Sequence, residues 1–166
     1  FEKRYDRRTG KRIIAYYCVD HTEALMATKL DKGNTYFLPF NQGSNGAGNN
    51  GGAGNPPNPN GYPTAYLWEE VLEKDSLLNI LQKFVHHDEK KKRIIFPRYH
   101  QLDVVRKLIA DVKENGAGKN YLIQHSAGSG KSNSIAWTAY RLASLHDENN
   151  KPVFSSVIIV TDRTVL

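Results

Sequence analysis

The segment from residue 121 to residue 143 constrains the fold more than any other part of the sequence. A short run of large side chains, Tyr121-Leu122-Ile123, precedes a stretch rich in glycine and serine, and apolar residues then recur at helical spacing (Ile135, Ala136, Ala139, Leu142 and Ala143). A strand, a glycine loop and a helix in this order form the context of a phosphate-binding loop. Because three consecutive large side chains suit a strand buried on both faces, we expect a parallel sheet covered by helices.

The residue types of the loop, Ala127-Gly128-Ser129-Gly130-Lys131-Ser132, match the needs of a bound triphosphate. Gly128 and Gly130 permit a tight turn that points backbone N–H groups at phosphate oxygens, and the helix N-terminus adds partial positive charge. We expect the Lys131 ammonium to lie beside the β and γ phosphates, and the Ser132 hydroxyl to be a ligand of Mg²⁺. His125 stands where the strict motif has a glycine, and we assign it a structural role at the end of the strand.

The segments around this loop extend the same pattern. Residues 99–114 carry a helical apolar stripe that stops at Asn115-Gly116-Ala117-Gly118, and Val157-Ile158-Ile159-Val160 predicts a second buried strand. A strand, loop, helix and strand in sequence imply a right-handed crossover between parallel strands. We therefore predict an α/β fold in which residues 97–166 form the first part of a P-loop parallel sheet.

Residues 1–96 predict a separate α+β piece. We expect strands at residues 13–18 and 36–40, the second at a sheet edge because of Pro39, a short helix at 22–30, and two short helices within 65–87 that break near Asp75-Ser76. Residues 88–93 predict a charged connector. Residues 41–63 consist almost wholly of glycine, asparagine and proline and predict a mobile surface loop, because few apolar side chains offset the ordering entropy.

Composition limits the classes of protein. The 166 residues are 39% apolar and 24% charged, with a net charge of +6, which fits a folded chain and permits a polyanionic partner without requiring one. A single cysteine, Cys18, excludes an internal disulfide scaffold and zinc fingers. Since the sequence has no long apolar run and no hydrophobic signal core, we predict a cytoplasmic protein without a membrane partner. The chain opens without an initiator Met inside a basic pattern, which predicts a piece of a longer protein.

Six blocks of the sequence carry a family resemblance. Phe96-Pro97-Arg98-Tyr99-His100-Gln101, with Gln101 thirty positions before Lys131, and the phosphate-binding loop itself resemble the opening of a superfamily 2 helicase or translocase motor. Together with Val160-Thr161-Asp162-Arg163, they resemble the restriction and motor (R) subunit of type I restriction enzymes, in which a histidine at position 125 is normal. In the first half, Phe37-Leu38-Pro39-Phe40-Asn41, Gly54-Asn55-Pro56-Pro57-Asn58-Pro59 and Tyr66-Leu67-Trp68-Glu69 resemble the stretch that joins the nuclease domain of that subunit to its motor.

The resemblance implies a RecA-like ATPase domain that starts near residue 97 and follows the end of a nuclease-like domain. It implies that Gln101 reads adenine, that residues 127–132 bind ATP with Mg²⁺ on Ser132, and that Thr161 and Arg163 contact the DNA backbone. The implied partners are double-stranded DNA and the modification and specificity subunits. The implied activity is ATP-dependent DNA translocation and cleavage, with the nuclease residues upstream of this chain and the remaining motor motifs beyond Leu166. The chain alone is then predicted to be inactive.

Two other classes of function stay open on the sequence. A small nucleotide-binding or kinase-like P-loop module would use the same loop, although the chain lacks the downstream acidic motif of a complete P-loop enzyme. A non-catalytic DNA-binding or assembly piece would use the basic runs at residues 4–12 and 90–93, although most such runs are solvated faces.

Overall fold

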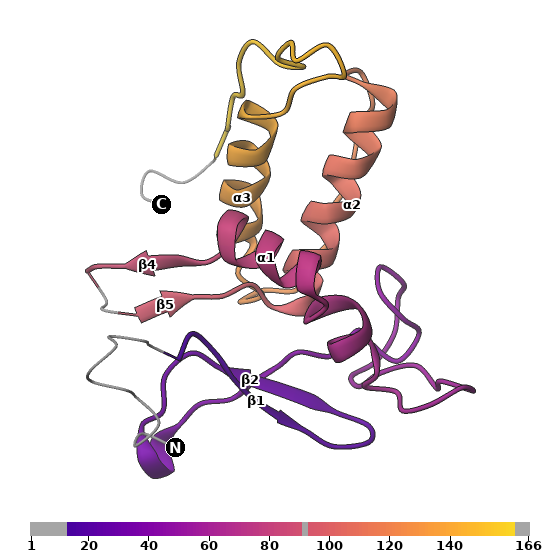
Figure 1. Cartoon of the computed structure of the whole chain (residues 1–166), viewed down its shortest axis with the longest axis vertical. Helices are drawn as coiled ribbons and strands as arrows, with labels where there is room; N and C mark the ends of the chain where they lie inside the picture. Colours follow the sequence, from indigo (N-terminus) through magenta and orange to yellow (C-terminus); the bar gives the residue numbers. More distant parts are fainter. Residues whose placement is uncertain (1–12, 91–92, 162–166) are drawn as a thin grey trace. The chain divides into compact units, whose positions relative to one another are not determined.

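The computed structural model describes residues 13–90 and 93–161 of the chain. The chain forms two compact units, residues 1–100 and 101–166. The domain boundary predicted from the sequence lies near residue 96. The protein is a mixed α/β structure with two small antiparallel sheets (Figure 1). The described residues contain no parallel strand pair, which differs from the predicted parallel sheet.

The first sheet has three strands, β1 (Tyr16–Val19), β2 (Ala24–Ala27) and β3 (Leu38–Pro39), in the order β1-β2-β3. Pairing joins Val19 to Ala24 and Leu25 to Pro39, so Pro39 lies on an edge strand as predicted. A 3₁₀ turn, η2 (Lys32–Asn34), lies between β2 and β3.

The predicted helix at residues 22–30 is wrong, because β2 occupies this segment. The carboxylate of Asp20 accepts hydrogen bonds from the backbone N–H groups of Thr22 (2.7 Å) and Glu23 (2.8 Å), which closes a turn directly after β1. The turn reverses the chain and brings Ala24 into register with β1. The ladder that follows overrides the helix propensity of the Glu-Ala-Leu-Met-Ala run.

Aromatic side chains form much of the core of the first unit. Phe40 is completely buried, and its ring meets the rings of Tyr17 and Tyr99 edge-on, with centroid separations of 5.4 and 6.0 Å. Tyr66 packs against Tyr99 at 5.0 Å and donates a 2.7 Å hydrogen bond to the carbonyl of Phe40. Burial raises the pKa of the Tyr17 and Tyr66 hydroxyls well above their ordinary value.

Residues 41–63 form the predicted loop, and side-chain hydrogen bonds connect it to the first sheet; its predicted mobility stays a prediction. The side chain of Asn55 accepts from the N–H of Gln42 (2.8 Å) and donates to the carbonyl of Thr22 (2.8 Å) and to the side chain of Asn41 (3.0 Å). Asn41 in turn accepts from the N–H of Ala24 in β2 (2.8 Å). Side-chain amides thus replace the missing apolar contacts and fix the loop to the first sheet.

A π-helical turn, η3 (Leu67–Val71), and helix α1 (Lys74–Lys83) follow the loop. The carboxylate of Glu73 caps α1 by accepting from the N–H groups of Asp75 (2.9 Å) and Ser76 (3.1 Å). The two predicted helices are therefore present, and the break between them lies before Lys74 rather than at Asp75-Ser76.

A short hairpin, β4 (His86–Asp88) and β5 (Arg93–Ile95), replaces the predicted charged connector (Figure 1). Its strands pair from His86 with Ile95 to Asp88 with Arg93, and the guanidinium of Arg93 lies 3.7 Å from the Asp88 carboxylate. Residues 91 and 92 lie outside the described residues.

The helices of the second unit agree with the sequence. Helix α2 (Tyr99–Asn115) starts at the last residues of the first unit, and helix α3 (Lys131–Ala143) follows the glycine loop. Gly116 ends α2 with φ +72°, a left-handed conformation that favours glycine. Most of the predicted stripe of α2 is buried (Leu102, Val105, Ile109 and Val112). No helix among the described residues is long and apolar enough to cross a membrane.

The segment that follows α2 is attached to the last turns of that helix. The carboxylate of Asp111 accepts from the hydroxyl of Tyr121 (2.5 Å) and from the ammonium of Lys119 (3.1 Å). The hydrogen bond from Tyr121, and after it the hydrogen bond from Lys119, contributes most to a lowered pKa of Asp111. The bond between Tyr121 and Asp111 also raises the pKa of the Tyr121 hydroxyl.

The two predicted buried strands of the second unit are not formed in the structure. Residues 121–123 and 157–160 form no regular secondary structure, and neither run pairs with a strand in the described part of the chain. Leu122 is 92% exposed and Val160 is 89% exposed, so the predicted burial is not seen either. A strand requires a hydrogen-bonded neighbour, and apolar side chains in the sequence do not supply one.

Candidate nucleotide-binding site

Two glycines of the predicted phosphate-binding loop have left-handed backbone conformations. Gly128 has φ +73°, and Gly130, with φ +82° and ψ +33°, is the N-cap residue of α3. A Cβ atom at position 128 would meet no atom within 4 Å, so the backbone conformation, and not lack of space, favours glycine there. The loop therefore turns directly into the first turn of a helix.

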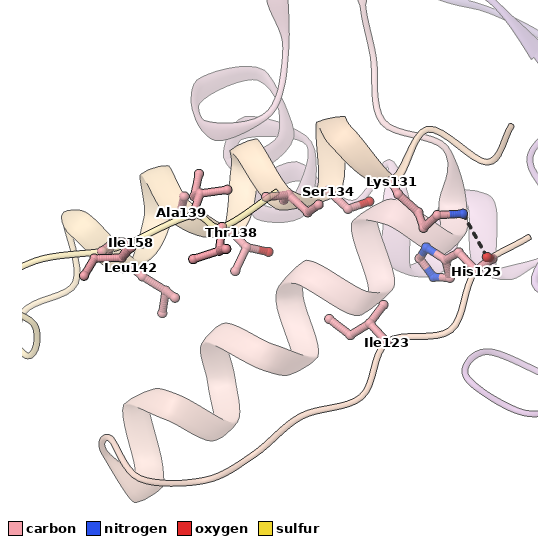
Figure 2. Close-up of a pocket in the computed structure, with 12 residues that line it drawn as sticks. Ile123, His125, Lys131, Ser134, Thr138, Ala139, Leu142 and Ile158 are labelled. Atoms are coloured by element: carbon pink, nitrogen blue, oxygen red, sulfur yellow. Dashed lines mark hydrogen bonds between the residues drawn. The ribbon is translucent and has the colours of Figure 1, made fainter. Parts of the chain in front are cut away.

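Lys131 is the first residue of α3, and its side chain folds back over the loop. The ammonium donates hydrogen bonds to the carbonyls of His125 (3.0 Å) and Ser126 (2.8 Å). Figure 2 shows the first of these bonds beside the His125 ring. The side chain is exposed, so the positive charge lies at the open side of the loop.

The N-terminus of α3 carries no group that would repel an anion. The first turn of α3 contains no acidic residue, and Gly130 provides no side-chain cap. The first N–H groups of a helix have no intrahelical acceptor, and the helix dipole makes this end partly positive. Ser132 is the second residue of the helix and is exposed, as is Ala127 in the loop, whereas Ser129 is buried. These donors fit a phosphate group.

Gln101 lies against this loop. Its side chain is 3% exposed, and its amide nitrogen donates to the carbonyls of Gly130 (2.9 Å) and Ser129 (3.2 Å). The resemblance assigns this amide to the adenine base, whereas in the structure its nitrogen holds the loop. The predicted role in adenine recognition stays a prediction.

The other predicted site residues lie elsewhere in the second unit. Thr161 is exposed directly after the second apolar run, residues 157–160, and Arg163 lies outside the described residues. Among residues 13–90 and 93–161, no group of three or more histidine, cysteine, aspartate or glutamate side chains could hold a metal ion. The predicted Mg²⁺ ligand on the protein is the hydroxyl of Ser132.

A cavity of about 410 Å³ lies beside the loop along α3 (Figure 2). His125 and Lys131 line one part of it, and most of the remaining lining is apolar (Ile123, Ile135, Ala139, Leu142 and residues 157–160). Both predicted strands thus contribute to one cavity against the same helix, although they do not pair.

Sequence reasoning missed two features of the site. The carbonyls of His125 and Ser126 accept hydrogen bonds from the Lys131 ammonium. Every residue has a backbone carbonyl, so the residue types at these positions do not predict the contact. The bonds from Gln101 to the loop cross 28 and 29 positions in the sequence, which only a structure reveals. Comparisons of the chain with protein-family models, with curated proteins and with solved structures found no match.

Proposed function

We propose that this chain is the nucleotide-binding part of an ATP-driven DNA translocase, the motor of the restriction subunit of a type I restriction-modification system. The observation that carries the proposal is the loop at residues 125–132. Two left-handed glycines lead into the N-terminus of α3, and the Lys131 ammonium lies across the loop carbonyls. This arrangement suits a triphosphate bound by backbone N–H groups, a helix dipole and one ammonium.

Each residue has a defined part in this proposal. Backbone N–H groups of residues 128–132 bind the β phosphate, and Lys131 exchanges its loop carbonyls for β and γ phosphate oxygens. The hydroxyl of Ser132 helps to hold Mg²⁺, which neutralises the charge that develops during phosphoryl transfer. Gln101 keeps the loop in place from the first turns of α2.

We also propose that the apolar segments 121–123 and 157–160 become parallel strands of a RecA-like sheet when further strands pair with them. Support comes from the shared cavity, because Ile123 and Val157–Val160 line it together against α3. Pairing would bury Leu122 and Val160, whose exposed surface is unfavourable in water. In this sheet, α3 is the crossover helix between the two strands.

Translocation and cleavage belong to the whole subunit in this proposal. Thr161 and Arg163 follow the second apolar segment and would contact the DNA backbone. The cleavage residues and the acidic motor motifs lie in other parts of the subunit, which acts with the modification and specificity subunits. This chain alone is expected to bind MgATP without turning it over, since phosphoryl transfer needs a carboxylate that positions water.

The test is ATP-driven translocation by a whole subunit that carries this chain. Lys131→Ala is expected to abolish translocation and the DNA cleavage that depends on it, with the circular dichroism spectrum unchanged because the Lys131 side chain is exposed. Lys119→Ala, in the same unit but bonded to Asp111, is the matched control and should translocate normally. Normal translocation by the Lys131 variant would exclude this loop as the ATP site.

A further inference from the structure

Three aromatic side chains form an exposed cluster in the first unit, away from the residues of the phosphate-binding loop in sequence. The rings of His21 and Tyr62 lie 5.1 Å apart, and those of Tyr62 and Trp68 lie 6.4 Å apart. Tyr62 is 53% exposed and Trp68 is 47% exposed. Exposed tryptophan and tyrosine side chains in one cluster are typical of a binding surface and not of a solvated one.

Side-chain hydrogen bonds to backbone carbonyls hold the segment that carries His21. The hydroxyl of Thr64, which is 1% exposed, donates to the carbonyl of Asp20 (2.8 Å), next to His21. Asn55 donates to the carbonyl of Thr22 (2.8 Å). The cluster is therefore preorganised, so binding of a partner would lose little conformational entropy in these side chains.

The two segments that carry the cluster are acidic in sequence, although the whole chain has a net charge of +6. Residues 13–28 and 41–73 contain no lysine or arginine, and they contain five acidic residues (Asp20, Glu23, Glu69, Glu70 and Glu73). Glu69 and Glu70 follow Trp68 in the same helical turn and are exposed. Within the described part of the chain, their carboxylates form no ion pair or hydrogen bond.

We propose that this aromatic–acidic surface, made of His21, Tyr62, Trp68, Glu69 and Glu70, binds an arginine-bearing segment of a partner protein. A guanidinium stacks on tyrosine and tryptophan faces, and neighbouring carboxylates pair with it. A nucleic acid also stacks on aromatic rings, but its phosphates would meet carboxylates and no cation in these segments. The charge therefore favours a basic polypeptide over DNA or RNA.

The test is isothermal titration calorimetry of the 166-residue chain with a short glycine–arginine peptide. The same peptide with citrulline in place of arginine is the uncharged control. We expect the arginine peptide to bind and the citrulline peptide not to bind. Tyr62→Ala and Trp68→Ala should each weaken binding about two- to fivefold, the range of an exposed cation–π contact. Tyr140→Ala, which removes a tyrosine from α3 that is even more exposed than Tyr62, should leave binding unchanged.

A second readout locates the peptide. The indole N–H resonance of Trp68, assigned with Trp68→Phe, should shift on titration, and the paired substitution Glu69→Gln with Glu70→Gln should reduce the salt dependence of binding. Equal affinity for both peptides, or binding that neither Tyr62→Ala nor Trp68→Ala weakens, would overturn the proposal. Binding of a single-stranded oligonucleotide at Trp68 in place of the arginine peptide would also overturn it.

Discussion

Removing the Gln101 amide tests how the phosphate-binding loop is held. Its nitrogen donates to the carbonyls of Gly130 (2.9 Å) and Ser129 (3.2 Å) from a side chain that is 3% exposed. Two neutral hydrogen bonds contribute about 1 to 3 kcal/mol. Loss of one buried methylene adds about 0.8 kcal/mol. We therefore expect Gln101→Ala to lower the free energy of unfolding of the second unit by about 2 to 4 kcal/mol.

Urea unfolding measures this change if the signal comes from the second unit alone. Trp137 is buried in α3, so its fluorescence in a Trp68→Phe background provides that signal. Gln101→Glu separates hydrogen-bond donation from packing, because the glutamate has the same shape but donates only when protonated. Its destabilisation should therefore shrink as the pH falls. Gln124→Glu, at an exposed position, is the control and should show no such dependence.

Two results would refute this reasoning. One is an unfolding free energy of Gln101→Ala within about 0.5 kcal/mol of wild type, the range of an ordinary surface substitution. The other is a Gln101→Glu variant whose stability does not respond to pH. Nucleotide affinity then separates the two roles of the residue. If Gln101 only holds the loop in place, Gln101→Ala should weaken the binding of ATP and GTP equally. If Gln101 recognises adenine, the substitution should weaken the binding of ATP alone.

Three further predictions concern the loop, the helix end and the hydrogen-bonded loop of the first unit. Gly128→Ala should lower the free energy of unfolding by about 1 to 2 kcal/mol in urea unfolding, because residue 128 has a φ of +73°. Gly33→Ala is the control: a Cβ there also meets no atom within 4 Å, but Gly33 has no positive φ, so the loss of stability should be smaller. The bonds from Tyr121 and Lys119 depress the pKa of Asp111, so their stabilisation is present above about pH 4 and is lost as the pH falls through the folded-state pKa. In a carboxyl ¹³C titration, Tyr121→Phe should therefore raise the Asp111 midpoint. Asn55→Ala should lower the unfolding free energy of the first unit by about 1.5 to 4.5 kcal/mol, measured through Trp68, because three hydrogen bonds are lost.

Local signals in the sequence predicted the helices and the loop between them. The apolar stripe and Gly116 define α2, and Gly130 with Lys131 defines the start of α3, because periodicity and capping depend on residues within a few positions. The same local signals failed for residues 24–27. Their strand depends on pairing with β1 and β3, to which a helix-forming composition gives no clue.

Long-range hydrogen bonds account for the other differences. The connection of residues 41–63 to the first sheet depends on Asn55, whose amide reaches Thr22 across 33 positions, and composition alone does not reveal this contact. The apolar runs at 121–123 and 157–160 were predicted as strands from side-chain type. In the structure neither run forms a strand or pairs with one among the described residues. Apolar patterning therefore indicates which segments can be buried, but pairing decides which become strands.

Binding of MgATP to the 166-residue chain tests the central claim most directly. Isothermal titration calorimetry should show saturable binding at one site per chain. Lys131→Ala should abolish or greatly weaken it, because the ammonium that holds the phosphates is lost, while Lys119→Ala should bind as the unchanged chain does. Absence of MgATP binding, or equal binding by the Lys131 variant, would contradict the assignment of residues 125–132 as a nucleotide-binding loop.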